Sequence, residues 1–170
     1  AKEKSKFVVS SIFVNPTQFN NPNDLKKYPR TLNNDLNLLR SQSVDLVFCP
    51  DFNELYNNEE LLKVDLIGLD KNLEGSNRKD HFEGVIRVLN IFFSLIEPDL
   101  AFFGEKDYQQ FLIVEQFAKQ IFPKIKIIPC PTFRESNGLA MSSRNMLLTN
   151  SEKETASKIY QTLLYCRDNF

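Results

Sequence analysis

A lysine follows a strand-like run of the sequence, at the point where the chain turns into a helix. The apolar residues 100–103 end at Gly104, and Lys106, Asp107 and Gln110 follow before a helical pattern begins. The first amides of a helix attract anions, and a lysine adds a mobile charge that suits phosphate oxygens. An ordinary solvated helix start carries the same residue types, because the helix dipole favours acidic side chains there. This corner is therefore a candidate phosphate site only if other groups reach it.

Two further polar clusters could reach the corner. Asn15 and Gln18 follow an apolar run and place two amide side chains just beyond its end. Ser142, Ser143 and Arg144 combine hydroxyls with a guanidinium on a loop that follows a glycine, which suits closure over a polyphosphate. Taken alone, the Ser142–Arg144 cluster is better explained as an exposed polar loop before a helix cap.

Strands and helices are expected to alternate along most of the chain. This order predicts an α/β fold, a doubly wound (Rossmann-like) parallel sheet with helices on both faces. Ligands of such sheets bind beyond the carboxyl ends of the strands, where all three polar clusters lie. The expected strands are 7–14, 44–49, 100–103 and 125–128, and the expected helices are 31–40, 85–96, 107–122 and one starting near 149.

Three local features qualify this pattern. Residues 52–79 are polar and weakly patterned, which indicates an insertion or extended loop. Ser151 and Glu154 have the spacing of a capping box for the last helix. The character of the chain changes at Thr132, so we expect a boundary there, with one domain over residues 1–131 and the start of a small C-terminal α+β domain over 132–170.

Composition narrows the function classes. The 170 residues carry a net charge of −1, with 21 Lys and Arg against 22 Asp and Glu, so nothing indicates a nucleic-acid or membrane-surface partner. No apolar segment approaches the roughly 20 residues that span a bilayer. Cys49, Cys130 and Cys166 are odd in number and contain no C-x-x-C pair, which argues against disulfides and zinc and favours a cytoplasmic location. Cys49 and Cys130 end apolar runs and are expected to be buried.

Four segments together resemble one family: residues 12–19 (IFVNPTQF), 28–31 (YPRT), 103–110 (FGEKDYQQ) and 138–145 (GLAMSSRN). In order and spacing they resemble the pantothenate synthetases, also called pantoate–β-alanine ligases, over nearly the whole chain. The resemblance implies a nucleotidyltransferase-superfamily enzyme that activates pantoate with ATP and Mg²⁺ to a pantoyl adenylate, releasing pyrophosphate. β-Alanine would then attack, giving pantothenate and AMP. The resemblance also implies a homodimer.

The same resemblance assigns roles to residues through the matching motifs. Pantoate would be bound by Asn15, Gln18 and Gln110. The nucleotide would be bound by Gly104, Lys106, Asp107, Phe133, Met141, Ser142, Ser143 and Arg144, of which Lys106, Ser142, Ser143 and Arg144 would also be catalytic. Arg78 and His81 resemble residues on the β-alanine or dimer side of the pocket, and Asp35 is the one carboxylate expected near Mg²⁺.

The sequence departs from the family pattern in two places. The family's His-x-Gly-His (HxGH) motif has no counterpart, since His81 is the only histidine, and Asp35 stands where two or three carboxylates are usual. We therefore expect residues 1–131 to be a nucleotide- and pantoate-binding domain without its first strand and HxGH segment, and residues 132–170 to begin a lid domain. Two alternatives remain open: another small-molecule nucleotidyltransferase of the same fold, or a catalytically incomplete fragment that only binds or dimerises.

Overall fold

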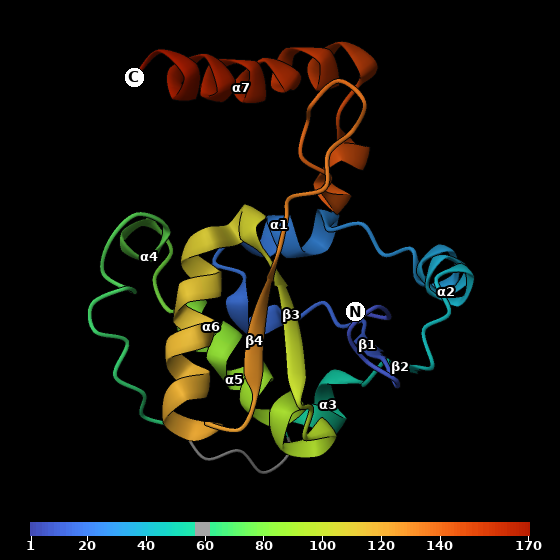
Figure 1. The fold of residues 1–170 in the computed structure, drawn as a ribbon, viewed down its shortest axis with the longest axis vertical. Coiled ribbons are helices and arrows are strands. Elements are labelled where there is room, and N and C mark those ends of the chain that lie inside the picture. The colour runs from blue at the N-terminus through green and yellow to red at the C-terminus, as the bar shows by residue number, and fades with distance from the viewer. Residues whose placement is uncertain (57–61) are drawn as a thin grey trace.

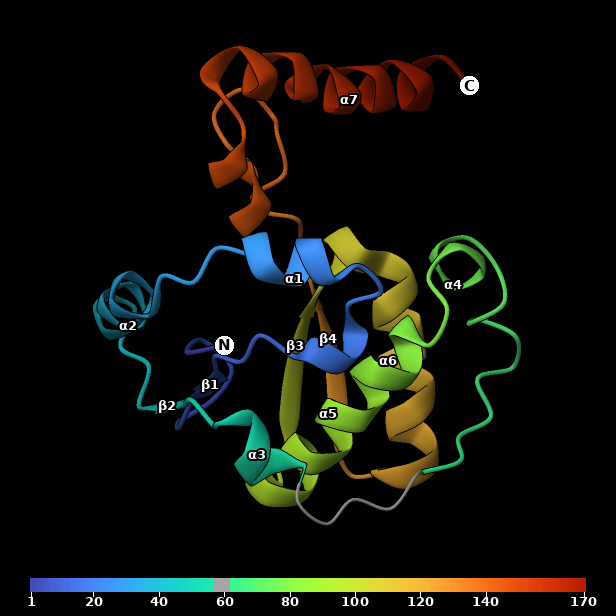
Figure 2. The same ribbon diagram turned by 180° about the vertical axis from the view of Figure 1, so that it is seen from behind.

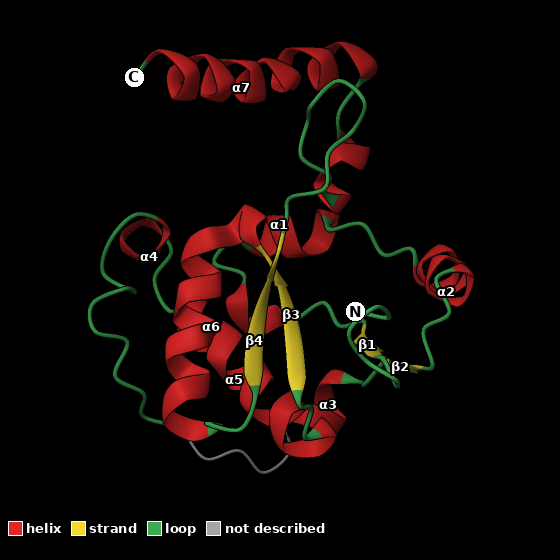
Figure 3. Ribbon diagram, in the orientation of Figure 1, coloured by secondary structure: helices red, strands yellow, loops and turns green. Residues whose placement is uncertain are grey.

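The strands of the protein form two parallel pairs in the computed structural model, which describes residues 1–56 and 62–170 (Figures 1 and 3). A helix lies between the partners of each pair along the chain, as the sequence predicts for strand–helix–strand units. The predicted α/β class with parallel strands is therefore confirmed. The pairs are β1 (Val9–Ser11) with β2 (Leu46–Phe48) and β3 (Leu100–Gly104) with β4 (Lys126–Cys130).

The helices follow the predicted order and in most cases the predicted bounds. The amphipathic segment 85–96 belongs to a helix that starts four residues earlier, at His81. The helices and 3₁₀ turns are η1 (Pro16–Gln18), α1 (Pro22–Lys27), α2 (Leu32–Ser41), α3 (Phe52–Leu55), α4 (Glu74–Asn77), α5 (His81–Ile96), η2 (Glu105–Asp107), α6 (Tyr108–Ile121), η3 (Ser143–Leu147) and α7 (Asn150–Asn169).

The hydrophobic core lies where α5 and α6 pack beside β3 and β4. Phe93 of α5 stacks on Phe117 of α6 with ring centroids 6.0 Å apart, and Ile113, Val114 and Phe117 have no exposed surface. Burying side chains of this size stabilises the fold by about 1.5–3 kcal/mol each. Helix α5 lies behind the β3–β4 pair in Figure 1 and in front of it in Figure 2. The core thus fixes the start of α5 relative to the end of β3.

The first two strands are shorter than predicted, β3 and β4 are close to their predicted lengths, and all four are more exposed than predicted. The run expected at 7–14 forms only three ladder residues, and Phe7 and Leu46 remain 63% and 47% exposed. The sequence predicts strands covered on both faces, but no residue of β1 to β4 is fully buried. The physical reason is that each strand has one hydrogen-bonded neighbour among the described residues, so neither pair forms the interior of a wide sheet.

Two predictions about proline and the extended loop need correction. The sequence predicts that Pro129 ends its strand, yet it lies within β4 opposite Phe103; a strand paired on one side tolerates the missing amide. The segment predicted to be an extended loop contains α3 and α4. Asp51 and Glu54 form a reciprocal capping box that starts α3, a signal present in the sequence. The part of that loop at 57–61 lies outside the described residues.

The cap of α7 and the burial of the cysteines also differ from the sequence predictions. The capping box is formed by Thr149 and Glu152, two residues before the predicted pair, because Thr149 is the residue with extended backbone angles. Cys49 is exposed and Cys130 only partly buried, since both lie at the ends of short, partly exposed strands. All three cysteines are free thiols.

The segment after β4 leads away from the core (Figures 1 and 2). Residues Arg134 and Ala140 form an antiparallel bridge, and the Arg134 guanidinium lies 3.6 Å from the Tyr160 ring centroid of α7. These contacts join the 134–140 turn to α7. The boundary at Thr132 stays a prediction. Among the described residues, no helix has the length and apolar character needed to cross a membrane.

Candidate functional site

A hollow of about 750 Å³ opens where the chain leaves β1 and β3. This is the end of parallel strands at which α/β folds bind ligands. The structure brings eleven of the predicted site residues to its wall: Asn15, Gln18, Arg78, His81, Lys106, Asp107, Gln110, Met141, Ser142, Ser143 and Arg144. Gly104, Phe133 and Asp35 are not part of the wall. The segments separated most widely in the sequence therefore do converge, as expected.

The Asn15–Gln18 turn forms one wall and is built around a buried amide. Asn15 is 3% exposed, and its Nδ2 donates to the Gly84 carbonyl at 3.0 Å and to Gln18 Oε1 at 3.2 Å. Its Oδ1 accepts from Thr17 Oγ1 and from the Tyr56 hydroxyl, both at 2.8 Å. The amide has two donor hydrogens, so both are used within the protein. The predicted contact between Asn15 and an acid ligand remains a prediction. For the Asn15 amide to donate to a ligand, its hydrogen bond to Gln18 Oε1 would first have to break.

The main chain of Gln18 is held by the residues that precede and open α5. His81 Nδ1 lies 2.8 Å from the Gln18 carbonyl oxygen, and Arg78 Nη2 donates to the same oxygen at 3.3 Å. Since a carbonyl can only accept, Nδ1 carries a proton. Burial lowers the pKa of His81, against the opposing effect of the Gln18 hydrogen bond, and favours the neutral ring. The neutral tautomer leaves Nε2 as an acceptor.

A glycine lets this turn approach α5 closely. A Cβ at Gly84 would stand 2.6 Å from the Thr17 carbonyl oxygen and 2.9 Å from the Gln18 amide nitrogen. Both atoms belong to the main chain, so no side-chain rotation would relieve the contact. The Asn15–Gln18 turn can therefore lie this close to α5 only because residue 84 has no side chain.

The opposite wall is the helix start that carries Lys106. The lysine is on η2, with its side chain 40% exposed and its Nζ 3.4 Å from Asp107 Oδ1. The next residues enter α6, and Gln109 Nε2 donates to the carbonyls of Leu69 and Asn72 at 2.7 and 2.8 Å. Gln109 therefore ties the loop before α4 to this helix start. Lys106 remains accessible to a ligand.

The third wall is the loop that carries Arg144. Its Nε and Nη2 donate to the two carboxylate oxygens of Asp24 at 3.1 and 2.7 Å, and its guanidinium lies 4.9 Å from the Tyr28 ring centroid. The hydrogen bond from Arg144 lowers the pKa of Asp24, and the same bond raises the pKa of Arg144. Ser142 accepts from the amide of Arg144 at 3.3 Å and caps η3.

Several wall residues were not predicted from the sequence. Tyr28 and Gln109 lie within the YPRT and FGEKDYQQ segments, so the motifs themselves contain a signal for both residues. Glu74 follows a leucine with a positive φ, and no pattern in the sequence places it here. The full set of additional wall residues is Phe13, Val14, Phe19, Tyr28, Leu73, Glu74, Phe82, Tyr108 and Gln109.

The protein groups of this hollow do not form a metal site. Within residues 1–56 and 62–170, no group of three or more His, Cys, Asp or Glu side chains could hold an ion. Asp35 lies on α2 and accepts a hydrogen bond from Thr31 Oγ1 at 3.0 Å, away from the wall residues. Phe133 is 79% exposed, and Gly104 ends β3 next to the Lys106 turn.

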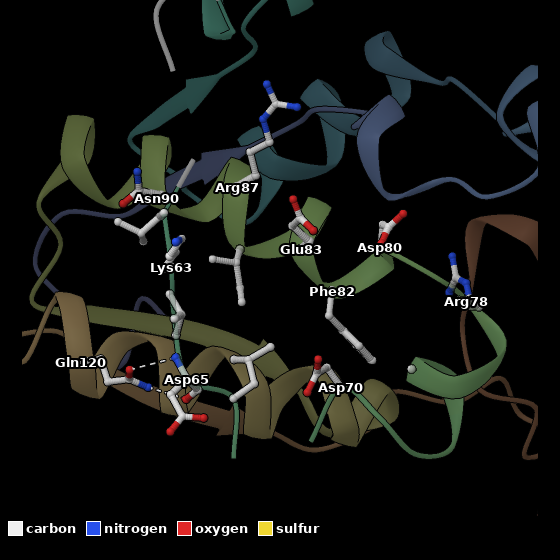
Figure 4. A pocket seen from close by; sticks show the side chains of 15 residues that line it. Lys63, Asp65, Asp70, Arg78, Asp80, Phe82, Glu83, Arg87, Asn90 and Gln120 are labelled. Atoms are coloured by element: carbon white, nitrogen blue, oxygen red, sulfur yellow. Dashed lines mark hydrogen bonds between the residues drawn. The ribbon is translucent and has the colours of Figure 1, made fainter. Parts of the chain in front are cut away.

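A second hollow, of about 810 Å³, is lined by residues of α5 and of the segment that precedes α4 (Figure 4). The segment 62–66 covers it and is clamped to α6, since Gln120 accepts from the Asp65 amide at 3.2 Å and donates to its carbonyl at 2.7 Å. Its charged lining residues are Lys63, Asp65, Asp70, Arg78, Asp80, Glu83 and Arg87.

Charge distinguishes the two hollows. Four acids against three bases line the second hollow, whereas three bases (Arg78, Lys106 and Arg144) against two acids (Glu74 and Asp107) line the first. The first also has the helix start of α6 and lies at the strand ends. An anionic ligand is favoured there. The fold and this hollow together define an α/β protein with an anion-compatible pocket at the carboxyl ends of its strands.

Comparison with known proteins identifies the family. The family model described as pantoate–β-alanine ligase matches residues 1–169. A pantothenate synthetase of Buchnera aphidicola subsp. Acyrthosiphon pisum (strain Tuc7) is 47% identical over 165 residues, which are 96% of this chain and 58% of that relative. The chain therefore belongs to the pantoate–β-alanine ligase family.

Solved structures agree with this assignment. The crystal structure of pantothenate synthetase from Thermus thermophilus has a TM-score of 0.92 and 39% identity, covering 98% of this chain and 61% of that one. The pantoate–β-alanine ligase from Francisella tularensis, complexed with β,γ-ATP and β-alanine, has a TM-score of 0.87 and 42% identity, covering 95% and 62%. The chain thus spans about three-fifths of the length of the proteins that it matches.

Proposed function

We propose that this chain belongs to an enzyme that condenses pantoate with β-alanine to form pantothenate at the expense of ATP, through a pantoyl adenylate, releasing pyrophosphate and AMP. The observation that carries the proposal is the convergence of Asn15–Gln18, Lys106–Gln110 and Met141–Arg144 on one hollow in a chain of this family. The Francisella tularensis relative, complexed with β,γ-ATP and β-alanine, supports the nucleotide and the amine as ligands.

The first step is a displacement at the α-phosphorus of ATP. A carboxylate oxygen of pantoate forms the new bond to phosphorus, and the bond to the pyrophosphate oxygen breaks. The negative charge that accumulates on the departing phosphates is the main electrostatic demand of such a step. Lys106 and Arg144 supply positive charge on two walls, and Ser142 and Ser143 supply hydroxyl donors beside Arg144. No protein nucleophile is required.

Pantoate would be bound mainly by the amide side chains on two walls of the hollow. Gln18 lies at the end of a turn whose main chain is fixed by α5, and Gln110 lies on the first turn of α6 across the hollow. A site built from polar groups that pair with substrate hydroxyls rejects analogues lacking them, because the protein groups are then left unpaired. The neutral His81, with Nε2 as an acceptor, is suited to accept a proton from the β-alanine ammonium before it attacks the adenylate.

Mg²⁺ would enter this site with ATP, since phosphates supply most ligands to such an ion and the described protein groups form no cluster for it. When bound, it would offset phosphate charge. A homodimeric assembly and a cytoplasmic location are part of the same proposal. The free thiols of Cys49, Cys130 and Cys166 are consistent with a reducing compartment.

Exchange of radiolabelled pyrophosphate into ATP tests the proposal, because exchange reports adenylate formation without β-alanine. We expect exchange that depends on pantoate. Exchange that proceeds equally without pantoate would instead indicate another nucleotidyltransferase of this fold. Binding of ATP with no exchange at all would indicate that the chain retains binding without catalysis.

A further inference from the structure

The pair formed by Arg144 and Asp24 connects two parts of the chain that are 120 residues apart in sequence. Asp24 lies on α1, which follows the Asn15–Gln18 turn, and Arg144 lies in the first turn of η3, which leads to α7. The two hydrogen bonds run side by side, from Nε and Nη2 to the two carboxylate oxygens. This bidentate geometry fixes the plane of the guanidinium as well as its position.

Two aromatic rings also contact the guanidinium of Arg144. Its guanidinium carbon lies 4.9 Å from the Tyr28 ring centroid and 5.7 Å from the Phe19 ring centroid, and these two rings meet edge to face at 5.6 Å. Both distances lie within the range in which a cation is attracted to an aromatic face. Tyr28 and Phe19 also line the hollow, whereas Asp24 does not. The carboxylate therefore holds Arg144 from behind the wall, outside the space a ligand would fill.

This arrangement leaves part of the guanidinium for a ligand. An arginine has five N–H donors, and Asp24 engages one on Nε and one on Nη2. The Nη1 group lies outside the pair. An arginine without such support would lose rotational freedom on binding a phosphate, and this ordering cost would weaken binding. With Asp24 and the rings in place, much of the ordering is present before the ligand arrives.

We infer that Asp24 is a positioning residue, which clasps the Met141–Arg144 loop to α1 and pre-orients Arg144 toward a phosphate group in the hollow. The inference deepens the proposed function, because it rests on Arg144 as a phosphate ligand. It also gives the segment after Thr132 a fixed point on the first domain. Asp24 itself makes no ligand contact and is not a catalytic residue.

The experiment compares Asp24→Asn with Asp24→Glu and with Glu115→Gln. The last variant removes an exposed ion pair with Lys119 on α6, 3.2 Å long and away from the hollow, and so controls for loss of one surface carboxylate. Hydrogen exchange of the 138–147 backbone amides is measured in the protein without ligand. Binding of ATP with Mg²⁺ is measured by titration calorimetry.

We expect Asp24→Asn to speed exchange at 138–147 and to weaken ATP binding about three- to tenfold, as suits loss of a partly exposed bidentate pair. Asp24→Glu should keep most of the exchange protection at 138–147 and most of the ATP affinity, because it keeps the carboxylate. Glu115→Gln should match the parent protein in both measurements. Unchanged hydrogen exchange in Asp24→Asn would show that Asp24 does not hold the Met141–Arg144 loop against α1. Unchanged ATP binding would overturn the positioning role. Tighter ATP binding would overturn it as well and show that Asp24 competes with the phosphate for Arg144.

The two measurements, hydrogen exchange and ATP binding, distinguish failure of this inference from failure of the proposed function. If the parent protein binds no ATP, the proposed function fails, while the exchange measurement still decides whether Asp24 holds the loop. If the parent binds ATP and Asp24→Asn alters neither readout, the inference fails and the proposed function stands. Thermal unfolding of each variant verifies that the exposed substitutions leave the fold intact.

Discussion

The two sides of the hollow are built in opposite ways. The Asn15–Gln18 turn is packed closely on α5, and it is hydrogen-bonded to residues of α5, to Tyr56 and to Arg78. The Lys106 and Arg144 side is exposed and held by two ion pairs, Lys106 with Asp107 and Arg144 with Asp24. One side is pre-formed by close packing and buried hydrogen bonds, and the other is held by exposed ion pairs that leave charged groups accessible to a ligand.

The difference matches what each side is proposed to recognise. A small polyol acid is distinguished from its analogues by hydrogen bonds of fixed geometry, which need a rigid frame. A triphosphate carries charge that many cation positions can satisfy, and it must enter and leave. Changes on the packed side should therefore mainly alter the free energy of unfolding, and changes on the exposed side should mainly alter ligand binding.

The largest effect is expected for Gly84→Ala. The added Cβ would meet main-chain atoms of Thr17 and Gln18 at 2.6–2.9 Å, so either α5 or the turn must move. We expect a loss of about 1–3 kcal/mol in the free energy of unfolding, measured by urea denaturation. The matched control is Gly104→Ala, where a Cβ has no neighbour within 4 Å and φ is −73°. Equal stability of the two variants would show that the turn is not close-packed.

A second effect is expected on the exposed side. Lys106→Ala should weaken binding of ATP with Mg²⁺ about tenfold or more, because one charge-assisted contact to phosphate is lost. The free energy of unfolding should change by less than about 0.5 kcal/mol, since the side chain is 40% exposed and pairs only weakly with Asp107. Calorimetry and urea denaturation measure the two quantities. A sharp loss of stability with normal binding would make Lys106 a structural residue.

The smallest effect is a pH dependence on the packed side. Burial lowers the pKa of His81 below its usual value near 6.5, so between these two pKa values the unfolded chain binds more protons than the folded one. The stability contributed by neutral His81 is therefore full above about pH 6.5 and is lost as pH falls through the lowered pKa. Since His81 is the only histidine, its NMR titration is unambiguous.

The control for this measurement is His81→Asn, which keeps a donor for the Gln18 carbonyl and removes the titrating ring. In that variant the pH dependence of stability in this window should vanish. A His81 pKa at or above 6.5 in the folded protein would contradict the neutral, buried ring. It would also make the two sides of the hollow more alike than the structure indicates.

The order of the elements and most members of the site could be predicted from the sequence. The alternation of apolar runs predicts parallel strands, and the apolar spacing of 85–96 predicts α5, because periodicity is a local property of the chain. Eleven of the predicted site residues line one hollow, since their motifs lie just beyond strand ends or on connecting loops. The Asp51–Glu54 and Thr149–Glu152 caps were also readable in principle.

The groups that support the site became apparent only in the folded chain. Gly84 is an ordinary residue of a helix in the sequence, and its importance comes from the approach of Thr17, 67 residues away. Asp24 has no distinguishing feature in the sequence, and its role comes from Arg144 lying beside it. Exposure of Cys49 and the brevity of β1 likewise depend on which strand lies next to which. Contacts between distant segments depend on packing, and no local pattern encodes them.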